Sequence, residues 1–359
     1  MLSVPETTTG LKPEFIAVVD KIYRQMCNLQ AGTRVLIITD SRTPRHVVTV
    51  FMGMAMAMGA VVSVSENFLA PPPADQPGFE WNPMVVAASR EADLIVDLAV
   101  GYASFMAEAI ERGAQIISPG DGTGGHHIEE SLIRTMLDVD LYQMRREAIA
   151  IERLFTSASE VRMTSEEGTD FTMNIEGLKG IASHEFLWDP DTQTKILDWS
   201  ALPPAAPGIV LPKFCGDGVV AADGFFLYSD LHQFPKSPVF LTFEKGKIVD
   251  IRGEDRLLVS RLNRWLDGIE GDTGRFGPVH FNLGINPKAR LNEHPEFEKL
   301  RGTITMGIGD SSLLTRMWNG AGLEPVVSDV HWDFIVMRPT IQLDGKTICE
   351  RGIMPEFKD

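Results

Sequence analysis

The sequence predicts two domains: an α/β domain with a parallel sheet over residues 1–157, and an α+β, strand-rich domain over residues 158–359. Three observations support this fold class. A chain of 359 residues exceeds the size at which one core usually keeps growing. Up to about residue 155, continuous apolar strands alternate with helical patterns, which is typical of a parallel sheet covered on both faces. Beyond about residue 160, short strands and hairpins replace this alternation.

In the first domain, the spacing of apolar residues separates helices from strands. Strands are expected at 34–40, 60–66, 93–100 and 114–118. Helices are expected at 13–29, 44–59, 103–113 and 141–158. The long apolar run at 47–65 changes to β-branched residues after a glycine and is flanked by charges and proline, so it indicates a buried helix followed by a strand rather than a membrane span.

In the second domain, alternating residues and turn signals predict hairpins at 160–177, around Lys245-Gly246, and around Asp344-Gly345. An amphipathic helix is expected at 255–269. Its apolar residues at helical spacing are Leu257, Leu258, Leu262, Trp265 and Leu266.

The composition excludes several classes of protein. A formal charge of −16 speaks against nucleic acid and anionic membranes, since both repel an acidic surface. Three scattered cysteines give neither a disulfide framework nor a C-x-x-C zinc pair. The N-terminus carries no secretory signal pattern, so we expect a cytoplasmic protein.

The segment Gly120–Gly125 matches G-x-G-x-x-G, the outline of a dinucleotide-binding loop. It follows the fourth strand rather than the first, and no acidic residue ends a second strand about twenty positions later, as the fingerprint requires. The segment therefore predicts a loop before a helix, whose contact with a ligand stays open. Tight NAD binding without metal would favour a non-catalytic or dinucleotide-binding protein.

A candidate metal site combines three polar side chains from two expected strands. His331 and Asp333 lie two residues apart and share one face of a strand, because side chains alternate along it. His280 lies in another short strand with Asn282 on the same face. Two histidines and one carboxylate are the set that holds mononuclear non-haem Fe²⁺ and leaves coordination positions for substrate and dioxygen. The alternative is a buried, hydrogen-bonded histidine beside a local His–Asp pair.

The second half of the chain resembles a known family. The segments "LTFEKGKIVDIRGE", "FGPVHFNLGINPKA" and "VVSDVHWDFIVMRPTIQLDGKTI" resemble the C-terminal domain of the M29 (aminopeptidase T-like) metallopeptidases. They are still more similar to the 2,5-dihydroxypyridine 5,6-dioxygenases of bacterial nicotinate degradation. The resemblance covers most of residues 160–350 in motif order and is architectural in the N-terminal half.

The resemblance implies an aromatic ring-cleaving dioxygenase with one Fe²⁺ held by His280, His331 and Asp333. M29 peptidases hold two metals, but His280 stands where their ligand is glutamate, and Thr305 stands where a ligand histidine is expected. The expected substrate is a dihydroxylated pyridine or a related N-heteroaromatic ring. A metallo-aminopeptidase or amidohydrolase of the M29 type is the alternative.

The resemblance is weaker around the substrate. Tyr102 and Asp198 stand where the dioxygenases are expected to carry pocket histidines. We predict His184 and Tyr102 as candidates for proton transfer, and Arg338, five residues beyond Asp333, as a contact for a substrate anion. The family also implies a homodimer or higher homo-oligomer.

Overall fold

The computed structural model describes residues 11–67, 81–101, 103–119, 125–227, 233–291, 295–318, 322–355 and 357. These residues form two compact units. Unit 1 comprises the chain up to Asp138 together with Glu185–Leu202, and unit 2 comprises Val139–His184 together with Pro203–Asp359. Each unit is described by itself.

The two units differ in two segments from the domain boundary predicted at 157/158. Helix α6 (Leu141–Ser157) belongs to unit 2, because its Phe155 ring packs edge-on against Phe281, with ring centroids 6.2 Å apart. The segment Glu185–Leu202 returns to unit 1, because strand β8 (Trp199–Ala201) pairs in parallel with β4. The two-domain division over 1–157 and 158–359 itself stays a prediction.

Unit 1 contains a parallel sheet in the order β2-β1-β3-β4-β8, which confirms the predicted fold class of this half. Its strands are β1 (Arg34–Asp40), β2 (Val61–Asn67), β3 (Leu94–Asp97), β4 (Gln115–Ser118) and β8. The predicted strands correspond to the first four. The three-residue β8 has no counterpart in the sequence analysis, because so short a segment shows no periodicity.

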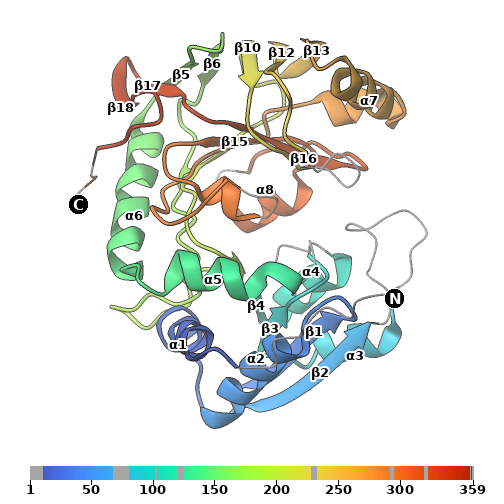
Figure 1. Ribbon diagram of the computed structural model, residues 1–359, viewed down its shortest axis with the longest axis vertical. Helices are drawn as coiled ribbons and strands as arrows, with labels where there is room; N and C mark the ends of the chain where they lie inside the picture. The colour runs from blue at the N-terminus through green and yellow to red at the C-terminus, as the bar shows by residue number, and fades with distance from the viewer. Residues whose placement is uncertain are drawn as a thin grey trace, which may run out of the picture. The chain divides into compact units, whose positions relative to one another are not determined.

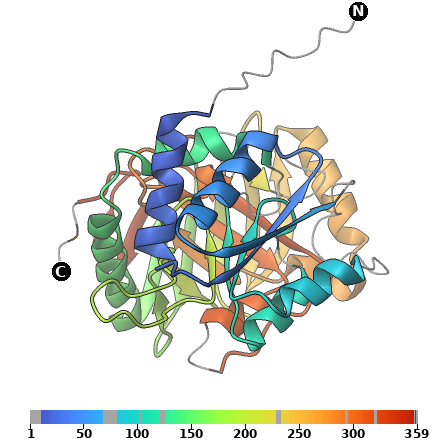
Figure 2. The same ribbon diagram turned by 90° about the horizontal axis from the view of Figure 1, so that it is seen from below.

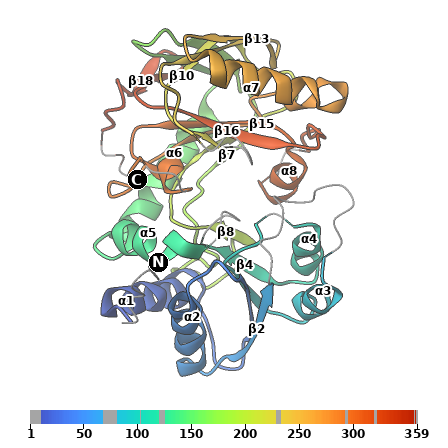
Figure 3. The same cartoon turned by 45° about the vertical axis from the view of Figure 1, so that its right-hand side comes forward.

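Helices cover both faces of this sheet, with α1 and α2 on one side and α3 and α4 on the other (Figure 3). Figure 2 shows α1 beside α2, where Phe15 packs edge-on against Phe51. The helices of unit 1 are α1 (Pro13–Lys21), continued by a π-helical turn (Ile22–Met26), α2 (Arg45–Ala57), α3 (Pro83–Ser89), α4 (Ser104–Glu111) and α5 (Ile128–Met136), which follows a 3₁₀ turn (Gly125–His127). The apolar run at 47–65 forms α2 and β2, and none of the described helices is long and apolar enough to cross a membrane.

Strand β3 ends at Asp97, three residues earlier than the sequence pattern predicts. The carboxylate of Asp97 is fully buried and accepts hydrogen bonds from the backbone N–H groups of Ala99, Val100 and Gly101, at 2.7–3.0 Å. The hydroxyl of Ser118 donates a fourth, at 3.1 Å. The side chain thus turns the backbone out of the strand and satisfies the N–H groups that leave the sheet.

Unit 2 contains two antiparallel sheets, which Figure 1 shows in its upper part. The seven-stranded sheet has the order β13-β12-β10-β6-β5-β17-β18, and the six-stranded sheet has the order β11-β16-β15-β14-β9-β7. The first consists of β5 (Glu160–Thr164), β6 (Asp170–Asn174), β10 (Asp217–Ala222), β12 (Val239–Glu244), β13 (Lys247–Gly253), β17 (Thr340–Leu343) and β18 (Lys346–Cys349). The second consists of β7 (Gly180–Ile181), β9 (Gly208–Val210), β11 (Phe226–Leu227), β14 (His280–Leu283), β15 (Ile304–Gly309) and β16 (His331–Val336).

The three hairpins predicted for this half are present as β5–β6, β12–β13 and β17–β18. With the helices of unit 2 they confirm the α+β, strand-rich fold class. The helices are α6, α7 (Arg256–Asp267) and α8 (Ser312–Trp318), with 3₁₀ turns at Glu270–Arg275 and Pro295–Lys299.

Helix α7 begins at a capping aspartate, Asp255, whose carboxylate accepts a hydrogen bond from the Leu258 N–H at 3.2 Å. It buries Leu258, Leu262 and Leu266, as the helical spacing predicts. Leu257 was expected in this apolar face, but it is 67% exposed, since it lies on the opposite side of the helix from the buried leucines.

Candidate metal centre

Three neighbouring strands of the six-stranded sheet bring the candidate ligands together. β14 begins at His280 and β16 begins at His331, and both strands pair antiparallel with β15 between them. The register sets Gly307 of β15 opposite His280 on one side and opposite Asp333 on the other. His331 lies opposite Gly309, and Thr305 opposite Asn282, so these side chains share one face of the sheet.

The three predicted ligands form one compact cluster. His280 Nε2 lies 3.0 Å from Asp333 Oδ1 and 3.4 Å from His331 Nε2. His331 Nε2 lies 3.6 Å from Asp333 Oδ2. One ligand atom from each residue lies within 4.8 Å of the others, and no other group of three such residues is found in the described ranges.

Hydrogen bonds on the far side of each imidazole determine which ring nitrogen carries the proton. His331 Nδ1 lies 2.7 Å from the backbone carbonyl of Asp310, which can only accept, so Nδ1 donates. Asn282 donates its Nδ2 to the Ala206 carbonyl at 2.7 Å, which leaves its Oδ1 to accept from His280 Nδ1 at 2.6 Å. In the neutral imidazoles both Nε2 atoms therefore carry a lone pair, and both lone pairs point toward the carboxylate.

The charges in the cluster are strongly coupled. Burial alone would lower the pKa of His331, but the charge and hydrogen bonding of Asp333, with the carbonyl of Asp310, raise it to about 9. Burial would raise the pKa of Asp333, but the two imidazoles hold that pKa well below its usual range. The carboxylate thus stays ionised in this cluster and attracts positive charge.

Two buried oxygens on this face have no hydrogen-bond donor. Asp333 Oδ1 is close to His280 Nε2 but outside hydrogen-bonding geometry, and Thr305 Oγ1 has no partner in the part of the chain that the structure describes. An unsatisfied buried oxygen lowers the free energy of unfolding by roughly 1–3 kcal/mol, so it indicates a partner such as an ion or a ligand. When both rings are neutral, two imidazole lone pairs and an ionised carboxylate fit a cation, and two nitrogens with one oxygen suit Fe²⁺ among other transition metals.

Of the two predicted proton-transfer residues, the structure describes only His184, which is not part of this cluster. His184 is buried and follows β7, which is separated from β14 by β9 in the sheet order. Tyr102 lies outside the described residues, as does most of the Gly120–Gly125 loop. The catalytic roles of His184 and Tyr102 stay predictions.

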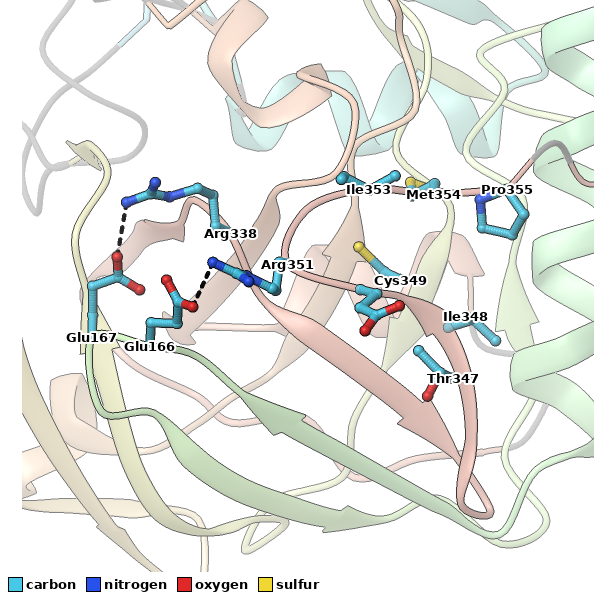
Figure 4. Close-up of a pocket in the computed structure, with 11 residues that line it drawn as sticks. Glu166, Glu167, Arg338, Thr347, Ile348, Cys349, Arg351, Ile353, Met354 and Pro355 are labelled. Carbon is cyan, nitrogen blue, oxygen red and sulfur yellow. Dashed lines mark hydrogen bonds and ion pairs between the residues drawn. The ribbon is translucent and has the colours of Figure 1, made fainter.

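Arg338 lies in a different environment from the one that the prediction assumed. It follows the far end of β16, which ends at Val336, and lies in the bend before β17. Figure 4 shows its guanidinium paired with Glu167, at 2.9 Å, on the wall of a pocket of about 690 Å³. None of the three candidate metal ligands lines this pocket, and the contact of Arg338 with a substrate anion stays a prediction.

The sequence analysis missed several residues that shape the site. Asn282 was placed on the correct face, but its bridge from His280 to the Ala206 carbonyl depends on β9, which was not predicted. The residue type at 310 does not indicate that its backbone carbonyl accepts a hydrogen bond from His331. Gly307 could have been found only from the strand register, because glycine offers no ligand atom.

Known proteins resemble this chain at the level of family and fold. A family model described as 2,5-dihydroxypyridine 5,6-dioxygenase (NicX) matches residues 15–356. No curated protein matches the chain in sequence. Among solved structures, 2,5-dihydroxypyridine dioxygenase from Pseudomonas putida KT2440 is similar, with a TM-score of 0.74 and 16% identity over 95% of this chain and 96% of that one. AmpT from Thermus thermophilus is also similar, with a TM-score of 0.65 and 14% identity over 97% of this chain and 99% of that one. At these identities the structural likenesses show the fold alone.

Proposed function

The chain belongs to the 2,5-dihydroxypyridine 5,6-dioxygenase family, and from this premise we propose that it uses dioxygen to open the ring of a dihydroxylated pyridine or a related N-heteroaromatic compound. We propose His280, His331 and Asp333 as the ligands of a single Fe²⁺. The observation that supports this most directly is the convergence of two imidazole Nε2 atoms on the buried carboxylate of Asp333, whose Oδ1 has no hydrogen-bond donor among the described residues.

When bound, Fe²⁺ in such a set leaves coordination positions for substrate and dioxygen, so neither 2-oxoglutarate nor nicotinamide is required. The chain itself supplies orientation. The Asp310 carbonyl and Asn282 hold the two Nδ1 protons, which fixes the tautomer and the direction of each imidazole. Asp333 supplies the one negative charge of the set.

Thr305 is the polar group best placed on this face to contact a bound substrate. Its hydroxyl is buried, lacks a partner and lies on β15 two residues from Gly307, on the same face as the proposed ligands. A substrate oxygen or ring nitrogen would satisfy it. His184 and Tyr102 remain our candidates for moving the proton of a substrate hydroxyl.

The M29 aminopeptidase is the competing function. The likeness to AmpT extends to the fold, but a peptidase of that type requires two metals, and Thr305 occupies the position where a second histidine ligand is expected. The number and kind of bound metal ions therefore separate the two functions.

The decisive experiment is anaerobic reconstitution with Fe²⁺, followed by a panel of hydroxylated pyridines that begins with 2,5-dihydroxypyridine. On admission of air we expect loss of ring absorbance with uptake of one dioxygen per ring. The variant His331→Ala should lose iron and turnover, whereas His46→Ala, a histidine of unit 1 paired with Glu129, should keep both. Two bound zinc or cobalt ions with release of amino acids from peptides would contradict the proposal.

The predicted homodimer or higher oligomer and the cytoplasmic location belong to the same proposal. Light scattering on the purified chain tests the first. Cell fractionation tests the second.

A further inference from the structure

Strand β15 lies between the strands that carry the proposed ligands, yet contributes no ligand of its own. Neighbouring strands lie about 4.8 Å apart, so the backbones at His280 and Asp333 are separated by roughly 10 Å across β15. The side chains nevertheless approach to 3.0 Å. They must therefore lean toward each other over the residue between them, which is Gly307.

Side chains on a strand stand roughly perpendicular to the sheet. A methyl group at 307 would occupy the volume of the His280 imidazole: it would overlap Nε2 and Cδ2 and lie 2.8 Å from Cε1. Real side chains essentially never approach so closely. The three nearest atoms all belong to this one side chain and none to the backbone.

We propose that Gly307 is a positioning residue for the metal centre: the absence of a side chain there gives the His280 imidazole the space in which its Nε2 can face Asp333 and His331. The inference rests on the proposed iron site. The backbone does not explain the glycine, since its φ does not lie in the left-handed region that favours this residue type. The imidazole explains it.

Alanine at 307 would drive His280 into another rotamer. The imidazole would then lose its bond to Asn282, and Nε2 would leave the cluster. We expect the variant Gly307→Ala to lower Fe²⁺ affinity at least 100-fold while the fold is kept. The matched control is Gly53→Ala in helix α2, where an added methyl group meets no atom within 4 Å, and this variant should bind iron as the unmodified chain does.

A double-mutant cycle tests the mechanism apart from activity. The variants are Gly307→Ala, His280→Ala and both together, and the measurements are iron stoichiometry, melting temperature without metal, and the ¹⁵N shifts of the histidine rings. We expect Gly307→Ala alone to lower the melting temperature and to shift the His280 resonances. In the His280→Ala background, where the methyl group finds an empty volume, it should leave the melting temperature unchanged.

The outcomes distinguish the inference from the proposed function. If Gly307→Ala binds iron normally while His280→Ala does not, the positioning role is wrong and the ligand set stands. If the methyl group lowers the melting temperature equally in the unmodified chain and in His280→Ala, glycine is needed for the backbone rather than for the imidazole, and the inference is also wrong. If His280→Ala keeps full iron affinity, the ligand set fails, and the positioning role fails with it.

Discussion

Asp97 in unit 1 and Asp333 in unit 2 are both buried aspartates on sheet strands, but their carboxylates differ in what surrounds them. Asp97 accepts three backbone N–H groups and a serine hydroxyl. Asp333 has two imidazoles beside it and leaves Oδ1 without a donor.

The difference separates a structural carboxylate from one poised for a ligand. Burial raises the pKa of Asp97, and the hydrogen bonds only partly offset this. The carboxylate is therefore costly to bury, but its hydrogen bonds order the end of the strand. At Asp333 the surrounding groups draw the pKa down and keep an anion with an unused oxygen. Burial alone would not distinguish the two; the number of donors does.

The largest expected effect comes from Asp333→Asn. The amide removes the only negative charge of the proposed ligand set, so we expect iron to be lost and turnover to fall by about 10³-fold or more, equivalent to ~4 kcal/mol. The metal-free variant should melt at a lower temperature than the unmodified chain at neutral pH, because His331 loses the carboxylate that raises its pKa and stabilises its charged form. Calorimetry and iron analysis check both statements, and normal iron content would refute the ligand role.

Iron itself should stabilise the chain. At a free Fe²⁺ concentration a hundredfold above Kd, we expect a gain of about 2.7 kcal/mol, which a chelator reverses. The gain should vanish in Asp333→Asn and persist in Asp97→Asn. Anaerobic thermal melts with and without iron measure it, and an equal gain in both variants would place the metal elsewhere.

Asp97→Asn should lower the stability of the fold and, unlike Asp333→Asn, leave iron binding unaffected. The amide nitrogen cannot accept from the Gly101 N–H, so one buried donor loses its partner at a cost of about 2 kcal/mol. Iron stoichiometry should not change. Chemical denaturation measures the loss, and an unaltered unfolding midpoint would mean that the four hydrogen bonds contribute little.

The affinity for iron should rise with pH. Because the pKa of His331 in the metal-free protein is about 9, above the 6.5 of an unperturbed histidine, the ring carries a proton at neutral pH that the metal must displace. The stability that this proton contributes is present below pH 6.5 and is lost as the pH rises through about 9. Between pH 7 and 8 we expect affinity to increase about tenfold with release of one proton. Anaerobic titration calorimetry in two buffers tests this, and a flat profile would contradict it.

The smallest effect is expected from Thr305→Val, which keeps the shape and removes a hydroxyl without a partner. We expect the substrate-free protein to gain up to about 1 kcal/mol of stability and iron binding to stay unchanged. If the hydroxyl contacts the substrate, kcat/KM should fall about tenfold. Steady-state kinetics together with melting curves decide this; unchanged kinetics would leave Thr305 with no part in substrate binding.

The period of two along a strand was enough to predict that His331 and Asp333 share a face. The pairing of both with His280 rested on the resemblance, because residues about fifty positions apart meet only through the register with β15. The sequence does not predict the tautomers, because one depends on the backbone carbonyl of Asp310 and the other on the hydrogen bond from Asn282 to the Ala206 carbonyl, two residues before β9.

The fold class was predictable for a similar reason. Alternating strands and helices indicate a parallel sheet through local periodicity alone. Asp97 shows the limit, because its apolar neighbours continue the strand pattern through Val100, whereas the carboxylate ends the strand by capturing the next N–H groups. A pattern of apolar residues does not show that a side-chain carboxylate competes with the neighbouring strand for these N–H groups.

The order of the ligand strands along the chain also constrains biosynthesis. The strand with His331 and Asp333 follows both β14 and β15 along the chain, and it reaches His280 only across β15. The ribosome must therefore have translated β14, β15 and β16 before the last two proposed ligands can join the first. Until then a nascent chain holds one of the three proposed ligands without the other two, so we expect the proposed site to take up a metal ion only after β16 has joined the sheet.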